Sequence, residues 1–100
     1  MNEPPVLIIT FRGSRKLKFD IDYKNKFIEF EIWVINCENN GPPSFLAKTS
    51  NLFCIINEEM GLMPTHAYIF KCRATINLNQ YSDWSRDLKV KMISCILFFL

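Results

Sequence analysis

The chain has 100 residues, of which 49% are hydrophobic and 14% aromatic, and its 12 basic and 10 acidic side chains give a net charge of +2. This length fits a single domain, and this apolar content supplies a packed core and excludes a disordered chain. The basic and acidic residues are interleaved and nearly balanced, which argues against a nucleic-acid partner.

The first half of the chain predicts strands at residues 6–10, 16–22, 27–35 and 44–49. The second of these alternates apolar and charged residues, which is the period-two pattern of a strand with one buried face. The side chains expected to face inward from the second and third strands are Leu17, Phe19, Ile21, Phe30, Ile32 and Val34. Those expected to face outward from the third are Glu29, Glu31, Trp33 and Ile35.

The second half predicts three more strands, at residues 52–56, 68–75 and 88–92. In the first of them, Leu52 and Cys54 are the expected inward pair. The middle strand alternates strictly, so one face carries Tyr68, Phe70, Cys72 and Ala74, and the other carries Ile69, Lys71, Arg73 and Thr75. No amphipathic helix of useful length is predicted.

A corner is predicted just before the strand at 68–75. Pro64 has no N–H to donate to a sheet, so it marks the end of a connection. A tyrosine that begins a strand after such a corner, here Tyr68, sends its hydroxyl back to the main chain near Leu62, as in the tyrosine corner of β-sandwich domains.

Two motifs carry a family resemblance. The pattern Leu62-x-Pro64-x-x-x-Tyr68-x-Phe70-x-x-Arg73-Ala74 resembles the E–F corner and F strand of a fibronectin type III domain. The run Tyr81-Ser82-Asp83-Trp84-Ser85 resembles the WSXWS box of class I cytokine-receptor modules, with Tyr81 in place of the first tryptophan.

The resemblance implies an all-β fold, a two-sheet antiparallel seven-strand sandwich of the immunoglobulin-like type. Family members usually carry a core tryptophan near the end of the second strand, and here Phe19 or Ile21 must fill that volume. Residues 1–92 are the expected domain and residues 93–100 an apolar tail. For this tail three interpretations stay open: an extension of the last strand, the first half of a membrane helix, or an exposed apolar end.

Catalytic, cofactor and metal sites are not predicted. His66 is the only histidine, and the sequence places no nucleophile and acid with it. The cysteines Cys37, Cys54, Cys72 and Cys95 lack the spacing of metal ligands. Buried free thiols and disulfides both stay open for them.

Three groups of candidate binding residues follow. The resemblance implies a ladder of alternating aromatic and basic side chains, formed by Lys71, Arg73, Tyr81 and Trp84. The alternation places Trp33 and Ile35 on the outer face of the same sheet, where an exposed tryptophan is typical of a partner surface, unless basic stems cover it or a register slip turns it inward. The loops at 23–26 and 76–82 are expected at one end of the fold, with Asn77, Asn79 and Gln80 as further partner contacts.

The predicted function is a non-catalytic protein–protein interaction or scaffold module, whose partner is another protein. An extracellular cytokine-receptor-like ligand-binding domain and a spacer within a larger chain are the alternatives. Membrane contact is expected only if the tail is a truncated membrane segment. The sequence shows no signal peptide and no N-x-[ST] acceptor, which favours the cytoplasm over the extracellular alternative.

Overall fold

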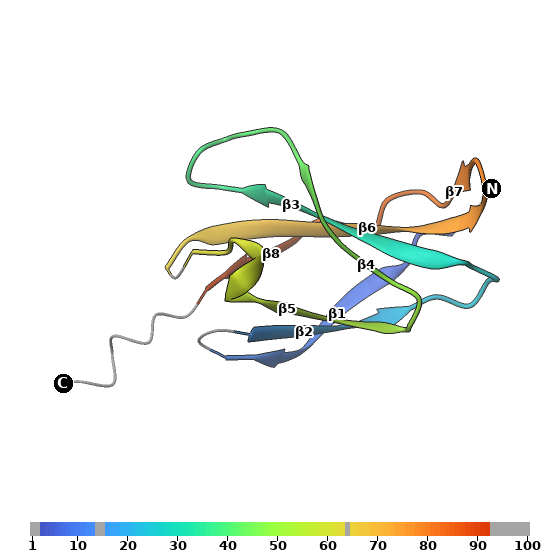
Figure 1. The fold of residues 1–100 in the computed structure, drawn as a ribbon, viewed down its shortest axis with the longest axis horizontal. Coiled ribbons are helices and arrows are strands. Elements are labelled where there is room, and N and C mark those ends of the chain that lie inside the picture. Colours follow the sequence, from blue (N-terminus) through green and yellow to red (C-terminus); the bar gives the residue numbers. More distant parts are fainter. Residues whose placement is uncertain (1–2, 14–15, 64, 93–100) are drawn as a thin grey trace.

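The chain folds into two antiparallel sheets stacked face to face. The computed structural model describes residues 3–13, 16–63 and 65–92. One sheet has the order β1-β2-β5, and in Figure 1 it lies beneath the other, which has the order β4-β3-β6-β7 with β8 also paired to β6. The strands are β1 (Val6–Arg12), β2 (Lys16–Asp22), β3 (Glu29–Asn36), β4 (Ser44–Thr49), β5 (Phe53–Asn57), β6 (Ala67–Asn77), β7 (Gln80–Tyr81) and β8 (Leu88–Lys91).

The predicted all-β sandwich is confirmed, and its seventh strand is split in two. Both β7 and β8 pair antiparallel with β6, Tyr81 opposite Thr75 and Leu88 opposite Phe70. The residues between them leave the regular ladder, so β7 and β8 are two pieces of one edge strand. A short 3-10 helix, η1 (Glu58–Met60), lengthens the connection from β5 to β6.

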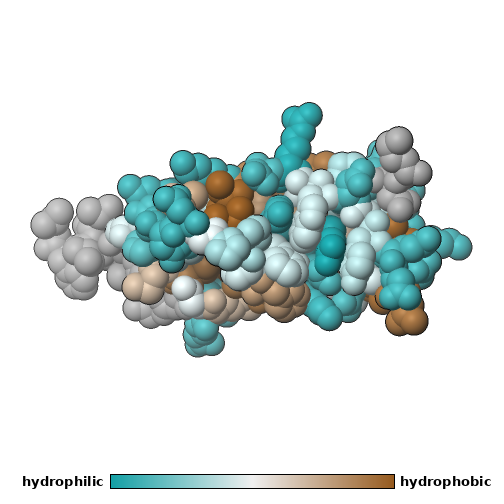
Figure 2. All heavy atoms as spheres, turned by 90° about the horizontal axis from the view of Figure 1, so that it is seen from above, coloured by the Kyte–Doolittle hydropathy of each residue, from teal (hydrophilic) through white to brown (hydrophobic). Residues whose placement is uncertain are grey.

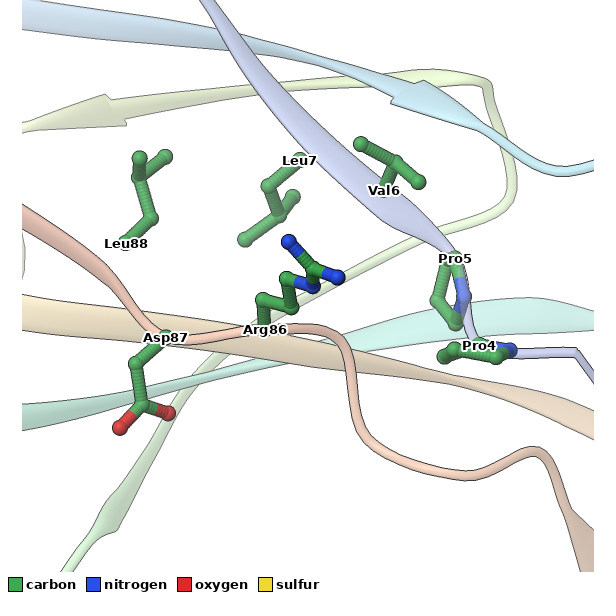
Figure 3. A pocket seen from close by; sticks show the side chains of 7 residues that line it. All are labelled: Pro4, Pro5, Val6, Leu7, Arg86, Asp87 and Leu88. Atoms are coloured by element: carbon green, nitrogen blue, oxygen red, sulfur yellow. The ribbon is translucent and has the colours of Figure 1, made fainter.

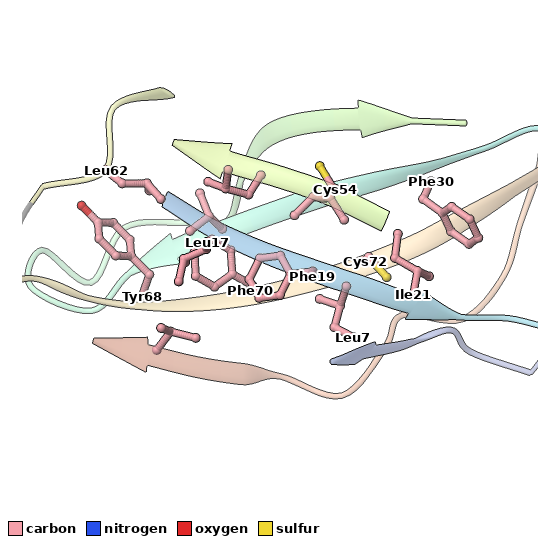
Figure 4. Packing of buried hydrophobic residues seen from close by; sticks show 14 of the residues in the cluster. Leu7, Leu17, Phe19, Ile21, Phe30, Cys54, Leu62, Tyr68, Phe70 and Cys72 are labelled. Atoms are coloured by element: carbon pink, nitrogen blue, oxygen red, sulfur yellow. The ribbon is translucent and has the colours of Figure 1, made fainter. Parts of the chain in front are cut away.

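The core lies between the sheets and is built from the inward faces that the alternation predicts. Phe19 of β2 and Phe70 of β6 are fully buried, and their ring centroids are 5.0 Å apart (Figure 4). Ile21, the other residue that the sequence suggests for this part of the core, is buried as well. The inward residues that the sequence predicts for β2, β3 and β6 are all buried, namely Leu17, Phe19, Ile21, Phe30, Ile32, Val34, Tyr68, Phe70, Cys72 and Ala74.

One predicted inward residue is wrong. Leu52 is 48% exposed, and the inward pair of β5 is Cys54 and Ile56. The reason is that the chain bends before Phe53, so Leu52 lies outside the strand and does not share its alternation. Its carbonyl still accepts a hydrogen bond from the Ile21 amide, 2.9 Å away, which ties the bend to β2.

The cysteines within the described residues, Cys37, Cys54 and Cys72, are free thiols. Cys54 and Cys72 belong to different sheets and are both buried in the core (Figure 4). Burial raises the pKa of both, that of Cys72 to about 12, so both are neutral at physiological pH. Cys95 and the tail at 93–100 lie outside the described residues.

Candidate functional site

The start of β6 is anchored by Tyr68. The Met63 amide donates a hydrogen bond to the Tyr68 hydroxyl, 2.6 Å away, and Leu62 is buried beside it. Gly61, with φ of 92°, makes the turn just before, in a region that favours glycine. These contacts fix where β6 begins. Pro64, the third residue of the predicted corner, lies outside the described residues.

Two serines supply hydrogen bonds to β6 where the edge strand is interrupted. The Ala74 amide donates to Ser82 Oγ at 2.8 Å and the Cys72 amide donates to Ser85 Oγ at 2.9 Å. In return the Ser82 and Ser85 amides donate to the carbonyls of Ala74 and Cys72. The Cys72 and Ala74 amides of β6 are thus satisfied by hydroxyls, and these four hydrogen bonds hold the segment between β7 and β8 against β6.

The fixed segment brings four side chains into one stack, which we call the ladder: Tyr81, Arg73, Trp84 and Lys71. The Arg73 guanidinium carbon lies 3.8 Å from the Tyr81 ring centroid and 4.7 Å from that of Trp84. Lys71 Nζ lies 4.4 Å from the Trp84 ring centroid. Arg73 and Lys71 can alternate with the rings because they are two residues apart on the outer face of β6. A cation over a ring contributes about 0.5–1 kcal/mol at an exposed site, and more when it loses water.

A carboxylate lies beneath the ladder. Glu31 Oε1 accepts hydrogen bonds from Arg73 Nε and from Trp33 Nε1, each at 3.0 Å. Glu31, which is expected to face outward and so to be in water, is only 9% exposed. The strand register explains it, since Glu31 lies directly opposite Arg73, and Trp33 opposite Lys71.

Trp33 is half-buried within the same cluster. Its ring meets Trp84 at 5.9 Å and Phe45 of β4 at 6.0 Å between centroids, both edge to face. Ile35 is also half-buried, opposite Ile69. Figure 2 looks onto this outer face of the larger sheet, where hydrophilic residues are interleaved with residues of intermediate hydropathy.

The predicted loop contacts lie on a tight hairpin. Asn77 ends β6 and Gln80 begins β7, so the connection is shorter than the sequence indicates. Asn77 Nδ2 donates to Gln80 Oε1 at 2.6 Å, and the Asn79 amide donates to Asn77 Oδ1 at 3.3 Å. The hairpin therefore sits some distance along β6 from Trp33, whose register partner is Lys71.

Sequence reasoning missed Leu78. It is 87% exposed at the tip of the hairpin between β6 and β7. Ile28, just before β3, is also exposed, and its amide donates to the Thr75 carbonyl at 2.8 Å. The available signal was a single leucine between two asparagines, an apolar residue in an otherwise polar turn.

A shallow hollow of about 300 Å³ opens between the start of β1 and the start of β8. In Figure 3, Arg86 extends toward Val6 and Leu7 while Asp87 points away from them. The rest of the lining is apolar, with Pro4, Pro5 and Leu88. These residues offer a single cation and no nucleophile, so they do not make a catalytic constellation.

Within residues 3–13, 16–63 and 65–92, three or more His, Cys, Asp or Glu side chains do not come together as metal ligands. This part of the chain also contains no helix that is long and apolar enough to cross a bilayer. His66 Nδ1 lies 3.5 Å from the Asn36 side-chain amide, and its ring stacks on Tyr68.

Comparisons with known proteins bear on the fold. No family profile matches the sequence, and no curated protein matches it. Among solved structures, a myokine is 17% identical, with a TM-score of 0.74 over 93% of this chain and 99% of that one. The fn3 domain of the human collagen alpha-1(XX) chain is 12% identical, with a TM-score of 0.72 over 92% of this chain and 86% of that one.

The chain has the fibronectin type III fold. The chain also matches part of a structure of the twitchin kinase region from C. elegans, which includes an Fn31 part, with a TM-score of 0.76 and 20% identity over 94% of this chain and 17% of that one. At these identities the likeness concerns the backbone, so fibronectin type III structures do not by themselves assign roles to the ladder or to the hairpin.

Proposed function

We propose that this fibronectin type III domain is a non-catalytic recognition module that binds another protein through the hairpin between β6 and β7. The observation that carries the proposal is Leu78, an apolar side chain that is 87% exposed on a turn. A large apolar side chain held in water gains free energy when a partner covers it.

The hairpin is ordered before any partner arrives. The Asn77–Gln80 and Asn79–Asn77 hydrogen bonds close the turn around Leu78. A contact residue that is already held in place loses less conformational entropy on binding, which favours affinity. The partner surface that suits this arrangement is an apolar pocket whose rim accepts hydrogen bonds from amide side chains.

A second apolar contact is available at the same end. The loop between β2 and β3 lies at the end of the sandwich where β7 lies (Figure 1), and it presents the exposed Ile28. We propose that Leu78 and Ile28 form the centre of the contact, with Asn77, Asn79 and Gln80 at its rim. Trp33 and Ile35 stay a predicted secondary contact on the neighbouring sheet face.

The test is retention of partners by Leu78→Ser. The purified chain, Leu78→Ser and the control Lys89→Ser are immobilised, exposed to extract from cells that express the chain, and the retained proteins are quantified by mass spectrometry. We expect a set of proteins that the parent chain and Lys89→Ser retain and that Leu78→Ser loses. If Leu78→Ser retains the same set, or if the parent chain retains none, the proposal is wrong and the spacer alternative is favoured.

The ladder and its two serines favour one alternative function. A stack of Tyr81, Arg73, Trp84 and Lys71 is what the resemblance to the WSXWS box implies, and the Ser82 and Ser85 hydrogen bonds lie in the same run of residues. It supports a cytokine-receptor-like ligand-binding domain. Surface plasmon resonance against a panel of purified cytokines tests this, and binding to one of them that Leu78→Ser abolishes would favour it.

A further inference from the structure

The outer face of the smaller sheet carries apolar side chains that the fold leaves in water. We call this the open face. Its apolar members are between 41% and 52% exposed, and in Figure 1 no other described segment lies on the outer side of β1, β2 and β5. The open face comprises Val6, Ile8 and Phe11 of β1, Lys16, Lys18, Asp20 and Asp22 of β2, and Phe53 and Ile55 of β5.

The charges of the open face are divided along its central strand. Lys16 and Lys18 occupy the first half of β2, and Asp20 and Asp22 occupy the second. The face is therefore neutral in sum but positive at one end and negative at the other. The Lys18–Asp20 pair within the chain is long, at 3.9 Å, and both side chains are more than 40% exposed, so it is readily exchanged for another pair.

The apolar residues on the flanking strands lie opposite these charged residues. Lys18 lies opposite Phe11 on one side and Ile55 on the other. Asp20 lies opposite Ile8 on one side and Phe53 on the other. The Lys18 row and the Asp20 row thus each consist of one charged side chain between two apolar ones.

We propose that the open face binds the open face of a second copy of this chain, related by a two-fold axis that lies in the interface and crosses β2 at the position of Phe19. This operation places each strand antiparallel to its own copy and exchanges the two ends of the face. Lys18 then faces Asp20 of the second copy, and Lys16 faces Asp22. On the flanking strands Ile55 faces Phe53 of the second copy, and Phe11 faces Ile8.

Self-complementarity selects this occupant. A two-fold contact uses the same patch twice, so it requires that a patch match itself after rotation, and the open face does so in charge and in apolar pairing. Sheets pack face to face about 10 Å apart with strands within about 30° of alignment, which the regular part of β2 permits. Residues 93–100 could cover apolar surface but contain no charged side chain to match Lys18 and Asp20.

The size of the face predicts a weak dimer. Three strands spaced about 4.8 Å apart and about seven residues long span on the order of 300 Å². Stable interfaces bury about 800 Å² of each partner, so we expect a weak and transient dimer. Because charged pairs contribute, raising the salt concentration from about 50 mM to about 500 mM is expected to weaken association.

Complementary charge reversal tests the geometry. Sedimentation equilibrium of the full chain is compared with Lys18→Asp, Asp20→Lys and the control Lys89→Asp, which lies on β8 of the other sheet. Each open-face variant alone sets like charges against each other, and we expect its self-association to weaken about tenfold or more. An equimolar mixture of Lys18→Asp and Asp20→Lys restores both opposite pairs and is expected to form heterodimers. Lys89→Asp should associate like the parent chain.

The outcomes separate the second copy from other occupants. A parent chain that stays monomeric at about 1 mM, the weak end of the affinity scale, overturns the proposal. So does a mixture of the two variants that stays monomeric while circular dichroism shows that both are folded. Association that survives each single reversal and is lost on deletion of residues 93–100 would assign it to the tail instead.

Discussion

The two outer faces of the sandwich carry similar residues, but the contacts that these residues make within the chain differ. On the larger sheet, Arg73 is stacked between two rings and also paired with a carboxylate, so its charge is satisfied within the chain. On the smaller sheet, Lys18 has only a long contact with Asp20 and a cation–ring contact of 5.2 Å with Phe53. A charged side chain that faces outward therefore stabilises the domain only where neighbouring strands supply close partners for it.

Strand register explains the difference. Across β3 and β6 the acidic Glu31 lies opposite the basic Arg73. Across β2 and β5, in contrast, charged residues lie opposite apolar ones, Lys18 opposite Ile55. The Glu31–Arg73 charges of the first face are thus paired across strands within one molecule. On the second face, the charges find partners on another strand only when a second surface covers them.

The sharpest test compares the same substitution on both faces. Arg73→Met leaves the nearly buried Glu31 carboxylate without its cation, and we expect the free energy of unfolding to fall by about 2–3 kcal/mol, somewhat less than for a fully buried pair. Lys18→Met should change it by less than about 0.5 kcal/mol. Urea denaturation at a concentration low enough to keep the chain monomeric measures both.

A double-mutant cycle with Glu31→Gln isolates the pair. In the Glu31→Gln background, Arg73→Met should cost clearly less than in the parent chain, because no buried charge is left unpaired. Equal effects of Arg73→Met and Lys18→Met would remove the contrast between the two faces.

The serine contacts should contribute less than the ion pair. Ser85→Ala leaves the buried Cys72 amide without an acceptor, and we expect a loss of about 1–2 kcal/mol together with faster hydrogen exchange of that amide. Ser50→Ala, at an exposed bend, is the matched control. Unchanged exchange at Cys72 in Ser85→Ala would show that the hydroxyl is dispensable there.

Alkaline pH should lower the stability of the fold through the core between the two faces. The Cys72 thiol has a pKa of about 12 in the folded chain against 9.0 as its ordinary value, because burial disfavours the thiolate. A raised pKa means that the folded state holds the thiol proton more tightly than the unfolded state does. The thiol's contribution to the free energy of unfolding is therefore complete below pH 9 and is lost as pH rises toward 12. Over that window, stability should fall by up to about 1.4 kcal/mol per pH unit from this group.

Cys72→Ala provides the comparison, since lysines and tyrosines also titrate at alkaline pH. Its free energy of unfolding should fall less steeply with pH than that of the parent chain above pH 9. Parallel curves for the two proteins would contradict the raised pKa.

The smallest expected change in stability comes from a substitution on the open face itself. Val6→Thr removes little buried surface from an edge strand, because about half of Val6 is already in water. We expect a change of less than about 0.5 kcal/mol in thermal unfolding of the dilute chain. A larger loss would mean that the described fold already covers this side chain.

The sequence predicted what depends on local alternation and missed what depends on register. The inward faces of β2, β3 and β6, including Phe19, followed from period two. The burial of Glu31 could not be predicted, because it requires knowing that Arg73 lies opposite. Leu52 failed for another reason, since a bend before β5 interrupts the alternation on which its assignment relied.

The serine hydroxyls at the broken edge strand have a consequence for misassembly. An exposed strand margin offers amides and carbonyls on which further chains can align into fibrils. Along β6 the groups of Cys72 and Ala74 are already occupied by Ser85 and Ser82. Growth by strand addition at this margin would first have to detach both serines, which makes them gatekeepers against amyloid-like stacking.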